Sequence, residues 1–206
     1  ARIVHGGISP TDVNGHSASF AARAREHAEE KRRIAERCLG LFGDQDTLFL
    51  DAGTTACEIA NRRNSRFRGT IITNALPAVN RARQLSAART ICLGGELLKD
   101  SQAFIGPLPI QSLQGLRSTI AFIGISGVRD GGFYIEREYE REIKLAAMTA
   151  ADQVAIVATH DKMERSALSH LVQFPKVDYV ITDAEPSASL AREFALAGTQ
   201  LIVASR

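Results

Sequence analysis

The sequence has little cysteine, no long apolar run and almost no net charge. Its three cysteines, Cys38, Cys57 and Cys92, are an odd number and lie far apart among apolar neighbours, so we expect buried thiols in the reducing cytoplasm. No apolar run approaches the roughly 18 residues of a membrane helix, and no charged-then-apolar leader opens the chain, so we expect no membrane partner. Because 25 Lys and Arg stand against 23 Asp and Glu, this segment alone is a poor candidate for binding DNA.

Signals for metal binding and covalent catalysis are also missing. The five histidines show no ligand spacing with cysteines or carboxylates, and the GxSxG motif of serine hydrolases is absent. The sequence therefore predicts no metal, no cofactor and no catalytic residue.

The length of 206 residues is sufficient for a stable core without disulfides or a structural metal, because such a chain buries roughly 70% of its unfolded surface. The chain begins with Ala1 rather than Met, which suggests a fragment or a processed product. Residues 1–18 are rich in Gly, Ser and Thr, a composition typical of turns and extended backbone. We therefore expect a linker over residues 1–18 and one folded domain over residues 19–206.

Residues 20–42 have the pattern of one long amphipathic helix. Apolar residues recur every three or four positions among ten Arg, Lys and Glu residues, and Gly43 is expected to end the helix. The charges alternate in sign, which favours a solvated, salt-bridged face over contact with nucleic acid. This helix would lie between the linker and the domain, where it can couple the two and make oligomer contacts.

Beyond Gly43, short apolar runs alternate with helical segments. Continuous apolar strands joined by helices are typical of a mostly parallel sheet with helices on both faces, so the predicted fold class is α/β and Rossmann-like. Segments 97–106 and 127–134 interrupt this alternation, and we expect them to be irregular or to form a small antiparallel appendage. The expected strands are residues 47–50, 70–72, 90–93, 120–123, 154–158, 177–181 and 200–203, and the expected helices are residues 56–63, 77–85, 110–116, 137–151 and 187–196.

Ligands of open α/β sheets bind beyond the carboxyl ends of the strands, so the residues that follow each strand are candidates for chemistry. Asp51, Gly53, Thr54 and Thr55 follow the first strand of the expected sheet. Free backbone N–H groups and two hydroxyls at a helix start can hold a phosphate. The alternative is structural: Thr55 and Glu58 form a capping box, and Thr54 fills a turn.

Two further strand ends carry polar or glycine residues. Thr73 and Asn74 follow the second strand, where Asn74 can cap a helix that has Pro77 in its first turn, without any ligand. The polar atoms of Asn74 are nonetheless expected to face the same crevice as the threonine pair. Gly94 and Gly95 follow the third strand, where bare backbone can approach a ligand or another chain closely.

Lysine is scarce, with five residues against twenty arginines, so a lysine near a strand end is informative. Lys144 lies in the expected helix 137–151, four residues after Glu140, and the alternative to ligand binding is a surface Glu–Lys pair. Lys162 follows the expected strand 154–158. Two lysines in a polar crevice would suit a phosphorylated, anionic small molecule.

With these residues in order, the chain resembles the C-terminal effector-sensing domain of the DeoR family of bacterial transcriptional regulators. The resemblance covers essentially the whole chain, and its motifs are common singly but specific as an ordered set. They are Arg2-Ile3-Val4-His5-Gly6-Gly7, Leu50-Asp51-Ala52-Gly53-Thr54-Thr55, Thr73-Asn74-Ala75-Leu76-Pro77, Leu93-Gly94-Gly95, Ile105-Gly106-Pro107, Ala121-Phe122-Ile123-Gly124, Glu142-Ile143-Lys144, Lys162 and Asp178-Tyr179-Val180-Ile181-Thr182-Asp183. The resemblance implies a fold related to ribose-5-phosphate isomerase and glucosamine-6-phosphate deaminase, sugar-phosphate effectors, and a winged helix-turn-helix DNA-binding domain before Ala1.

The chain departs from the family pattern at two positions. Ser126 lies in a segment where family members often carry an acidic residue, and Thr159 stands where they often carry Asp. Both changes alter which sugar hydroxyls the site would bind, so the resemblance indicates the class of effector and not its identity.

The resemblance and the strand ends together predict the effector-binding domain of a transcriptional regulator, a repressor, that senses a phosphorylated sugar or an intermediate of sugar metabolism. The phosphate would rest on the turn after Asp51 with Lys144 as its cation, while Asp51, Asn74 and Lys162 would contact the sugar. The full set of predicted ligand-binding residues is Asp51, Gly53, Thr54, Thr55, Thr73, Asn74, Gly94, Gly95, Ser126, Lys144 and Lys162. The regulator is expected to be a cytoplasmic homo-oligomer, a dimer or a tetramer.

Two other functions fit the sequence less well. A sugar-phosphate isomerase or deaminase needs a positioned carboxylate or His with a tuned pKa. Asp51 and Glu142 can be proposed for that role, but Ser126 stands where a carboxylate is expected, and only His160 among the histidines follows a central strand. A pure oligomerisation module would leave the polar and glycine residues at the strand ends unexplained.

Overall fold

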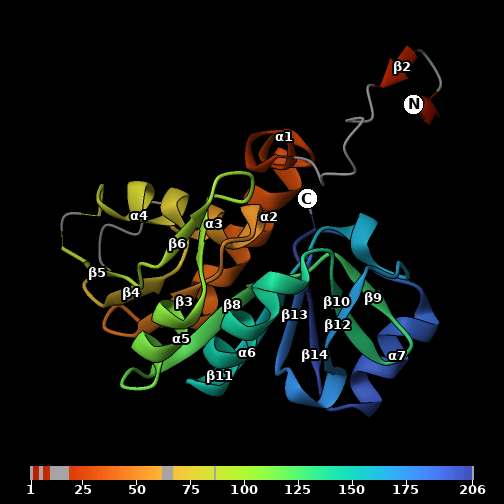
Figure 1. Ribbon diagram of the computed structural model, residues 1–206. Helices are drawn as coiled ribbons and strands as arrows, with labels where there is room; N and C mark the ends of the chain where they lie inside the picture. Colours follow the sequence, from red (N-terminus) through yellow and green to blue (C-terminus); the bar gives the residue numbers. More distant parts are fainter. Residues whose placement is uncertain (1, 5–6, 10–18, 62–66, 86, 206) are drawn as a thin grey trace.

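The core of the protein is a seven-stranded, fully parallel sheet with the strand order β14-β13-β11-β8-β3-β4-β5 (Figure 1). The computed structural model describes residues 2–4, 7–9, 19–61, 67–85 and 87–205. The seven strands are β3 (Thr47–Leu50), β4 (Thr70–Thr73), β5 (Arg89–Cys92), β8 (Ser118–Gly124), β11 (Ala151–Val157), β13 (Tyr179–Thr182) and β14 (Gln200–Val203). All seven predicted strands are therefore confirmed, two of them with the predicted bounds and the others with end points that move by at most three residues.

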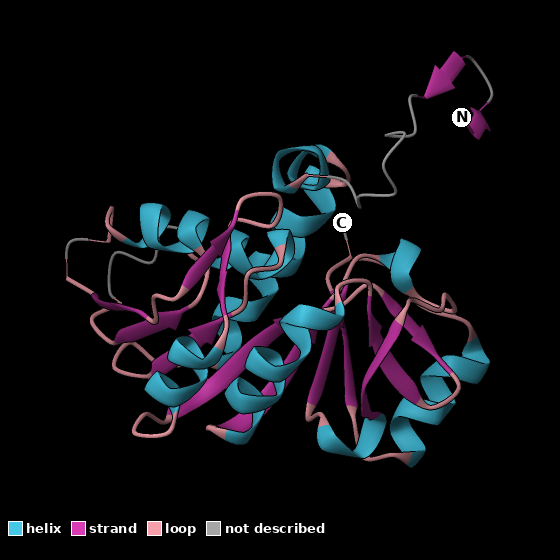
Figure 2. Cartoon of the chain, in the orientation of Figure 1, coloured by secondary structure: helices cyan, strands magenta, loops and turns pink. Residues whose placement is uncertain are grey.

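Helices cover both faces of this sheet (Figure 2). The described helices are α1 (Phe20–Arg25), α2 (Ala28–Cys38), α3 (Thr54–Ile59), α4 (Leu76–Ala82), α5 (Pro107–Leu113), α6 (Arg141–Thr149) and α7 (Ala188–Leu196). Short 3-10 helices are η1 (Leu39–Leu41), η2 (Glu138–Glu140), η3 (His160–Lys162) and η4 (Phe174–Lys176). Every predicted helix has a counterpart here, although the last two residues predicted for the helix 56–63 lie outside the described part of the chain.

The central strand β8 shows why the sheet must be covered twice. Its side chains alternate, so that Ile120 and Phe122 join the core with α2 and α3, whereas Ala121 and Ile123 join the core with α5, α6 and α7. All four residues have no exposed surface. A parallel strand buried on both faces reads as a continuous apolar run, which is the pattern that predicted the α/β class. That class is confirmed.

Small antiparallel sheets add to the parallel one, as predicted for the segments 97–106 and 127–134. Strands β6 (Glu96–Leu98) and β7 (Ala103–Ile105) form a hairpin. Strands β9 (Gly127–Arg129), β10 (Gly132–Ile135) and β12 (Ser169–Gln173) form a three-stranded sheet. Within the predicted linker, β1 (Arg2–Val4) pairs with β2 (Gly7–Ser9), and residues 1, 5–6 and 10–18 lie outside the described residues.

The prediction of one uninterrupted helix over residues 20–42 is wrong. The chain breaks between α1 and α2 at His27, which has a left-handed backbone with φ of 50°. The ammonium of Lys31 donates to the carbonyl oxygens of Arg23 and of Glu26, the latter at 2.6 Å, and so satisfies carbonyls that the end of α1 leaves free. Amphipathic periodicity continues across the break, because both helices pack against the same body, and therefore periodicity alone does not reveal the change of direction.

The expectation of three buried thiols is correct for two of them. Cys38 and Cys57 are buried, whereas Cys92 is exposed at the end of the edge strand β5. Within the described part of the chain, none of the helices combines the length and apolar character that crossing a bilayer requires.

Candidate functional site

Asp51, at the carboxyl end of β3, links this strand to the start of α3, the end of β8 and helix α6. Its carboxylate oxygen Oδ2 accepts hydrogen bonds from the backbone N–H groups of Gly53 at 3.1 Å and Gly124 at 3.0 Å, and from the ammonium of Lys144 at 2.6 Å. The residue is only 1% exposed. A buried carboxylate is tolerated when it is paired and hydrogen-bonded, and these three donors meet that condition.

Lys144 is a buried partner of Asp51. It reaches from α6 to Asp51 and also donates to the carbonyl oxygen of Gly124 at 3.1 Å. The Oε2 atom of Glu140 lies 3.8 Å from its nitrogen, so the helical Glu–Lys pair exists, but it is not on the surface: the Lys144 side chain is 3% exposed. The interpretation of Lys144 as part of a surface pair is therefore wrong.

Gly53 and Gly124 let the backbone close tightly around Asp51. A Cβ atom at Gly124 would lie 3.1 Å from Oδ2 of Asp51 and 3.2 Å from the Cα of Gly53. A Cβ atom at Gly53 would lie 3.2 Å from Oδ2 of Asp51 and 3.2 Å from the Cα of Gly124. Glycine at both positions is therefore explained by close packing between the end of β8 and the start of α3.

A cavity of about 440 Å³ opens above this cluster, at the carboxyl ends of β3, β8 and β11. Its wall contains six Lys or Arg residues and three Glu residues, so the cavity has an excess of positive charge. The basic residues are Arg23, Lys31, Arg137, Lys144, Lys162 and Arg165, and the acidic ones are Glu26, Glu136 and Glu140. Such a cavity has the size of a small-molecule site and the charge to attract an anion.

Six of the eleven predicted ligand-binding residues line the cavity. They are Gly53, Thr54, Thr55, Ser126, Lys144 and Lys162. Asp51 lies next to the cavity through Lys144, without lining it. Thr73, Asn74, Gly94 and Gly95 do not line it.

Thr73 and Asn74 are tied to neighbouring backbone. The Thr73 hydroxyl donates to the carbonyl of Leu50 at 2.6 Å and accepts from the N–H of Ala75 at 3.0 Å. The amide of Asn74 donates to the carbonyl of Phe104 at 3.1 Å and thereby holds the β6–β7 hairpin. Asn74 does not cap α4, whose N-cap is Ala75.

Two more local interpretations are settled by the backbone. Gly94 and Gly95 have φ angles of 67° and 111°, and a Cβ at Gly95 would lie 2.6 Å from the carbonyl oxygen of Ile105, so this pair serves a tight turn. Helix α3 begins at Thr54 with Gly53 as its N-cap and without a side-chain cap. The capping box of Thr55 and Glu58 is therefore not formed.

The two positions that depart from the family pattern make local hydrogen bonds. The Ser126 hydroxyl accepts from the N–H of Glu136 at 3.1 Å. Thr159 donates to Oδ1 of Asp161 at 2.5 Å, and Lys162 donates to the other oxygen of that carboxylate at 2.7 Å. These bonds outweigh the effect of burial, which by itself would raise the pKa of Asp161, so that this pKa is lowered.

Sequence reasoning missed the basic residues that α1, α2 and the segment after β10 bring to the cavity. Arg23 and Lys31 fell within the helix that was expected to have a solvated face, and Arg137 fell within a predicted helix. With twenty arginines in the chain, no single arginine stands out. These basic residues are recognised as a group only in the folded structure, where they line one cavity at the strand ends.

Burial and like charges lower the pKa values of two of these groups. The pKa of Lys31 falls to about 8, chiefly because burial disfavours its charged form, with Lys162 and Arg23 adding repulsion against the attraction of Glu26 and Asp161. The pKa of Arg23 is also lowered, first by burial and then by the charge of Arg137. The native cavity therefore holds positive charge at a cost that a bound anion would reduce.

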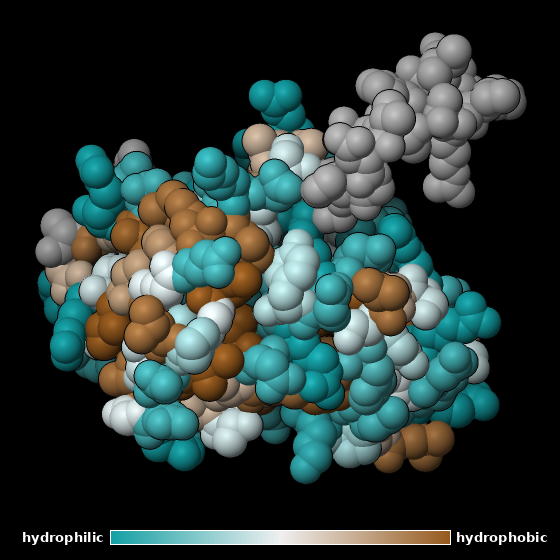
Figure 3. Space-filling view, in the orientation of Figure 1, coloured by the Kyte–Doolittle hydropathy of each residue, from teal (hydrophilic) through white to brown (hydrophobic). Residues whose placement is uncertain are grey.

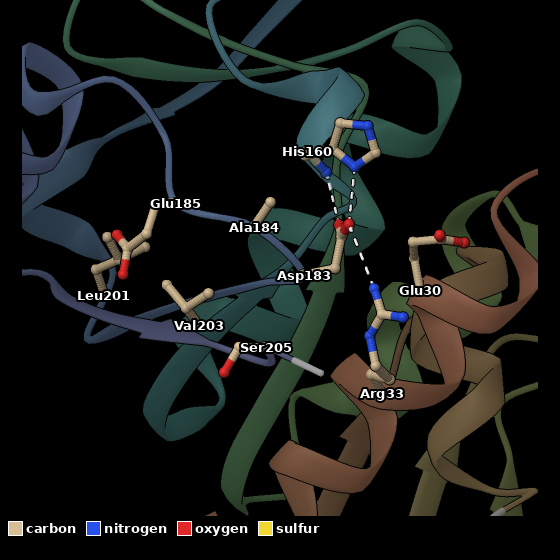
Figure 4. A pocket seen from close by; sticks show the side chains of 9 residues that line it. All are labelled: Glu30, Arg33, His160, Asp183, Ala184, Glu185, Leu201, Val203 and Ser205. Atoms are coloured by element: carbon tan, nitrogen blue, oxygen red, sulfur yellow. Dashed lines mark hydrogen bonds and ion pairs between the residues drawn. The ribbon is translucent and has the colours of Figure 1, made fainter.

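A second, more open cavity of about 750 Å³ is lined by residues of α2, η3 and β14 and of the segment after β13 (Figure 4). In it, Asp183 accepts from the N–H of His160 at 2.8 Å and contacts the His160 ring nitrogen Nδ1 at 2.7 Å. Arg33 of α2 lies 4.0 Å from the same carboxylate. This wall carries acidic groups, Glu30 and Glu185, as well as basic ones, so it shows no clear preference for an anion.

Nothing in the described residues indicates a metal centre: they contain no group of three or more His, Cys, Asp and Glu side chains placed to hold an ion. The arrangement is that of a binding cavity with a rigid floor, formed by Asp51 and Lys144, and a basic wall.

Comparison with known proteins finds transcriptional repressors among the relatives of this chain. The HTH-type transcriptional repressor GlcR of Bacillus subtilis is 28% identical over 198 residues, which are 96% of this chain and 76% of that protein. The glycerol-3-phosphate regulon repressor of Escherichia coli K12 is 31% identical over 169 residues, 82% of this chain and 67% of that protein. In the solved structure of the tetrameric eIF2B-beta2-delta2 complex from C. thermophilum, a chain that is 16% identical aligns with a TM-score of 0.57 over 84% of this chain and 61% of its own length. This last likeness shows the fold alone.

The family profile described as the DeoR C terminal sensor domain matches residues 26–184. Together with the repressor relatives, this match confirms the predicted regulator and disfavours the isomerase or deaminase alternative. The chain therefore belongs to the family of DeoR C-terminal sensor domains.

Proposed function

We propose that the cavity of about 440 Å³ binds a phosphorylated sugar or a related phosphorylated metabolite as the effector of a transcriptional repressor. The observation that carries the proposal is the charge of the cavity wall, six Lys or Arg residues against three Glu residues, at the carboxyl ends of the central strands. A phosphate is the common metabolite group that matches this charge, and the carboxylates suit the hydroxyl groups of a sugar or polyol. One relative is named for the glycerol-3-phosphate regulon, which supports an effector of this class.

Gly53, Thr54 and Thr55 remain our proposed phosphate neighbours, since all three line the cavity. Lys162 and Ser126 also line the cavity, and we propose that they contact the rest of the ligand. Asp51 acts beneath the cavity, where it holds Lys144 in place. Because Lys144 is committed to Asp51 and Gly124, its contact with a phosphate requires its third ammonium proton.

In the whole protein, we propose that residues 1–18 link this domain to a winged helix-turn-helix domain that binds DNA. Effector binding would change the affinity for DNA by favouring one arrangement of the subunits over another. A cytoplasmic location follows from this role, because a bacterial repressor meets its DNA there. A reading frame without a winged helix-turn-helix upstream of Ala1 would contradict this part of the proposal.

We also propose that the domain forms a homo-oligomer through the apolar surface around β6 and α5. Leu97 and Leu108 are 40% and 61% exposed there, and Figure 3 shows apolar surface gathered over this side of the molecule. Large apolar patches mark interaction sites more often than scattered exposed residues do. We expect Leu108→Glu to lower the mass measured by light scattering after size exclusion, whereas Leu196→Glu, at a solitary residue that is 82% exposed, should not. An unchanged mass for Leu108→Glu would place the interface elsewhere.

Thermal unfolding with and without small molecules tests the proposed effector class. The probes are glycerol 3-phosphate, ribose 5-phosphate and glucose 6-phosphate, each compared with the same compound without phosphate. A ligand at 100 times its Kd stabilises the native state by about 2.7 kcal/mol, so at least one phosphorylated probe should raise Tm by several degrees while its parent compound does not. Titration calorimetry then gives the Kd of the best probe.

The matched control separates specific binding from general attraction of anions. Arg117→Gln removes a positive charge from an exposed residue outside the cavity and should leave the Kd unchanged, whereas Lys162→Gln should weaken binding. Equal stabilisation by all phosphorylated and parent compounds, or by none of them, would refute the proposed function.

A further inference from the structure

Arg23 and Arg137 approach the cavity from two different elements. Arg23 belongs to α1, and Arg137 lies between β10 and η2. Both residues line the cavity, and Arg137 is only 7% exposed. The pKa of Arg23 is lowered first by burial and then by the charge of Arg137, which lines the same cavity. The fold therefore brings two like charges together in a confined space.

Three other cations of the cavity, the lysines, are hydrogen-bonded by the protein itself. The ammonium of Lys144 is bound to Asp51 and Gly124, and that of Lys162 to Asp161. Lys31 donates to two carbonyl oxygens at the end of α1. A guanidinium has five N–H donors in a planar fork that matches two oxygens of a phosphate, so arginine can keep its protein contacts and still bind an anion.

Helix α1 is well suited to respond to such an anion. It has six residues, and its start is capped by Ser19, whose hydroxyl accepts from the N–H of Ala22 at 3.3 Å. Its first residue, Phe20, is 6% exposed and packs with buried residues around α3 and α4. Hydrogen bonds from Lys31 hold the end of α1. A ligand that binds Arg23 therefore acts on a short helix whose start and end are both held by hydrogen bonds.

We infer that Arg23 and Arg137 form a two-arginine clamp for the phosphate of the ligand, and that the clamp holds α1 over the cavity when the ligand is bound. This inference rests on the proposed function, because it assigns the phosphate subsite of the same cavity. An anion between the two guanidinium groups replaces their repulsion by two attractions, and it joins α1 to the segment after β10. Ligand binding is thereby transmitted to α1, the first helix of the domain.

Calorimetric titration of the best phosphorylated probe into variants tests the clamp. Arg23→Gln and Arg137→Gln should each weaken binding about tenfold to a hundredfold, because each removes a charge-assisted contact to the phosphate. Arg23→Lys and Arg137→Lys keep the charge without the planar fork and should lose less affinity than the Gln variants. Arg117→Gln, at an exposed position outside the cavity, should bind as the parent does. Circular dichroism of every variant shows whether it is folded. Where a Gln variant is unfolded, the Lys variant at the same position is titrated in its place.

Hydrogen exchange gives a second readout that a merely structural role would not change. The probe should slow the exchange of amides in residues 20–26 of the parent protein, and this protection should be absent in Arg137→Gln, whose substitution lies outside α1. Parent-like affinity in folded Gln or Lys variants, or unchanged exchange of α1 on binding, would overturn the clamp while the proposed function stands. Failure of the parent to bind any phosphorylated probe would instead refute the proposed function itself.

Discussion

The ammonium nitrogen of Lys144 lies 2.6 Å from Oδ2 of Asp51, and the two side chains expose only 3% and 2% of their surface. The pair joins α6 to the ends of β3 and β8, and two backbone N–H groups complete the shell of the carboxylate. Because the two side chains are so little exposed, each charge is tolerated because of the other. The pair therefore lies beneath the cavity as a buried, hydrogen-bonded support.

Removing one member of this pair should be costly. We expect Asp51→Asn to lower the free energy of unfolding by about 3–5 kcal/mol, because it leaves the buried Lys144 charge without its main partner. The double variant with Lys144→Met should recover much of that loss. Urea unfolding measures all three proteins. Asp152→Asn, which breaks an exposed pair with Arg117, is the control and should cost less than about 1 kcal/mol. Equal costs for the two Asn variants would contradict the buried pair.

Gly124 should resist substitution for the same reason. In Gly124→Ala the new Cβ would press against Asp51 and the backbone of Gly53, so we expect a loss of about 1–3 kcal/mol in urea unfolding. Gly115→Ala is the matched control, since a Cβ at Gly115 meets nothing within 4 Å. That variant should be neutral or slightly stabilised. The close packing would be refuted if both variants had the stability of the parent.

The break between α1 and α2 predicts which of two substitutions at His27 gives the more stable protein. In a left-handed backbone glycine is favoured over alanine, so His27→Gly should be more stable than His27→Ala, by about 1 kcal/mol. In an uninterrupted helix the order would be reversed by a similar amount. Urea unfolding of the two variants decides between these cases, and alanine as the more stable residue would show that the helix is continuous.

The lowered pKa of Lys31 predicts that the stability of the protein depends on pH. The pKa of Lys31 is about 8 in the native state against an ordinary value of 10.5, so between these values the unfolded state binds more protons. The contribution of Lys31 to the free energy of unfolding therefore rises with pH. The charged groups that act on it are those of Glu26, Lys162, Asp161 and Arg23. From pH 7.5 to pH 9.5, the stability of the parent relative to Lys31→Gln should increase by about 2 kcal/mol.

Urea unfolding at the two pH values measures that difference, and titrations that the two proteins share cancel in it. Lys99→Gln, which removes an exposed lysine, serves as the control for a lost charge. A stability gap between the parent and Lys31→Gln that stays constant or shrinks with pH would contradict the lowered pKa of Lys31.

The three cysteines should differ in reactivity. Burial raises the pKa of Cys57 to about 12 and that of Cys38 further still, whereas Cys92 is exposed. Because the thiolate is the reactive form, a disulfide reagent such as DTNB should label one thiol rapidly in the native protein and all three in urea. A Cys92→Ser variant should lose the rapid phase. Rapid labelling of that variant would show that a second thiol is accessible.

Local pattern was sufficient to predict the sheet and the position of its ligand edge. The run from Ile120 to Ile123 is apolar at every position, as is typical of a strand that is covered on both faces. The same reasoning located Gly53, Thr54 and Thr55 at a strand end, and they line the cavity. Sequence reasoning could not distinguish a polar residue that lines the cavity from one that forms hydrogen bonds with neighbouring backbone. Thr73 and Asn74 have the chemistry of ligand-binding residues, but their hydrogen bonds go to Leu50, Ala75 and Phe104.

The amino-acid sequence by itself determined the α/β class, the order of the strands along the chain and the family, because apolar periodicity and ordered motifs are properties of neighbours in the chain. The tertiary structure alone decided that Lys144 pairs with Asp51, 93 positions away, and that Arg23 of α1 lines the same cavity as Arg137. These relationships depend on long-range packing and on the left-handed backbone of His27. The electrostatic interactions involved become strong only after distant segments have come together and excluded water.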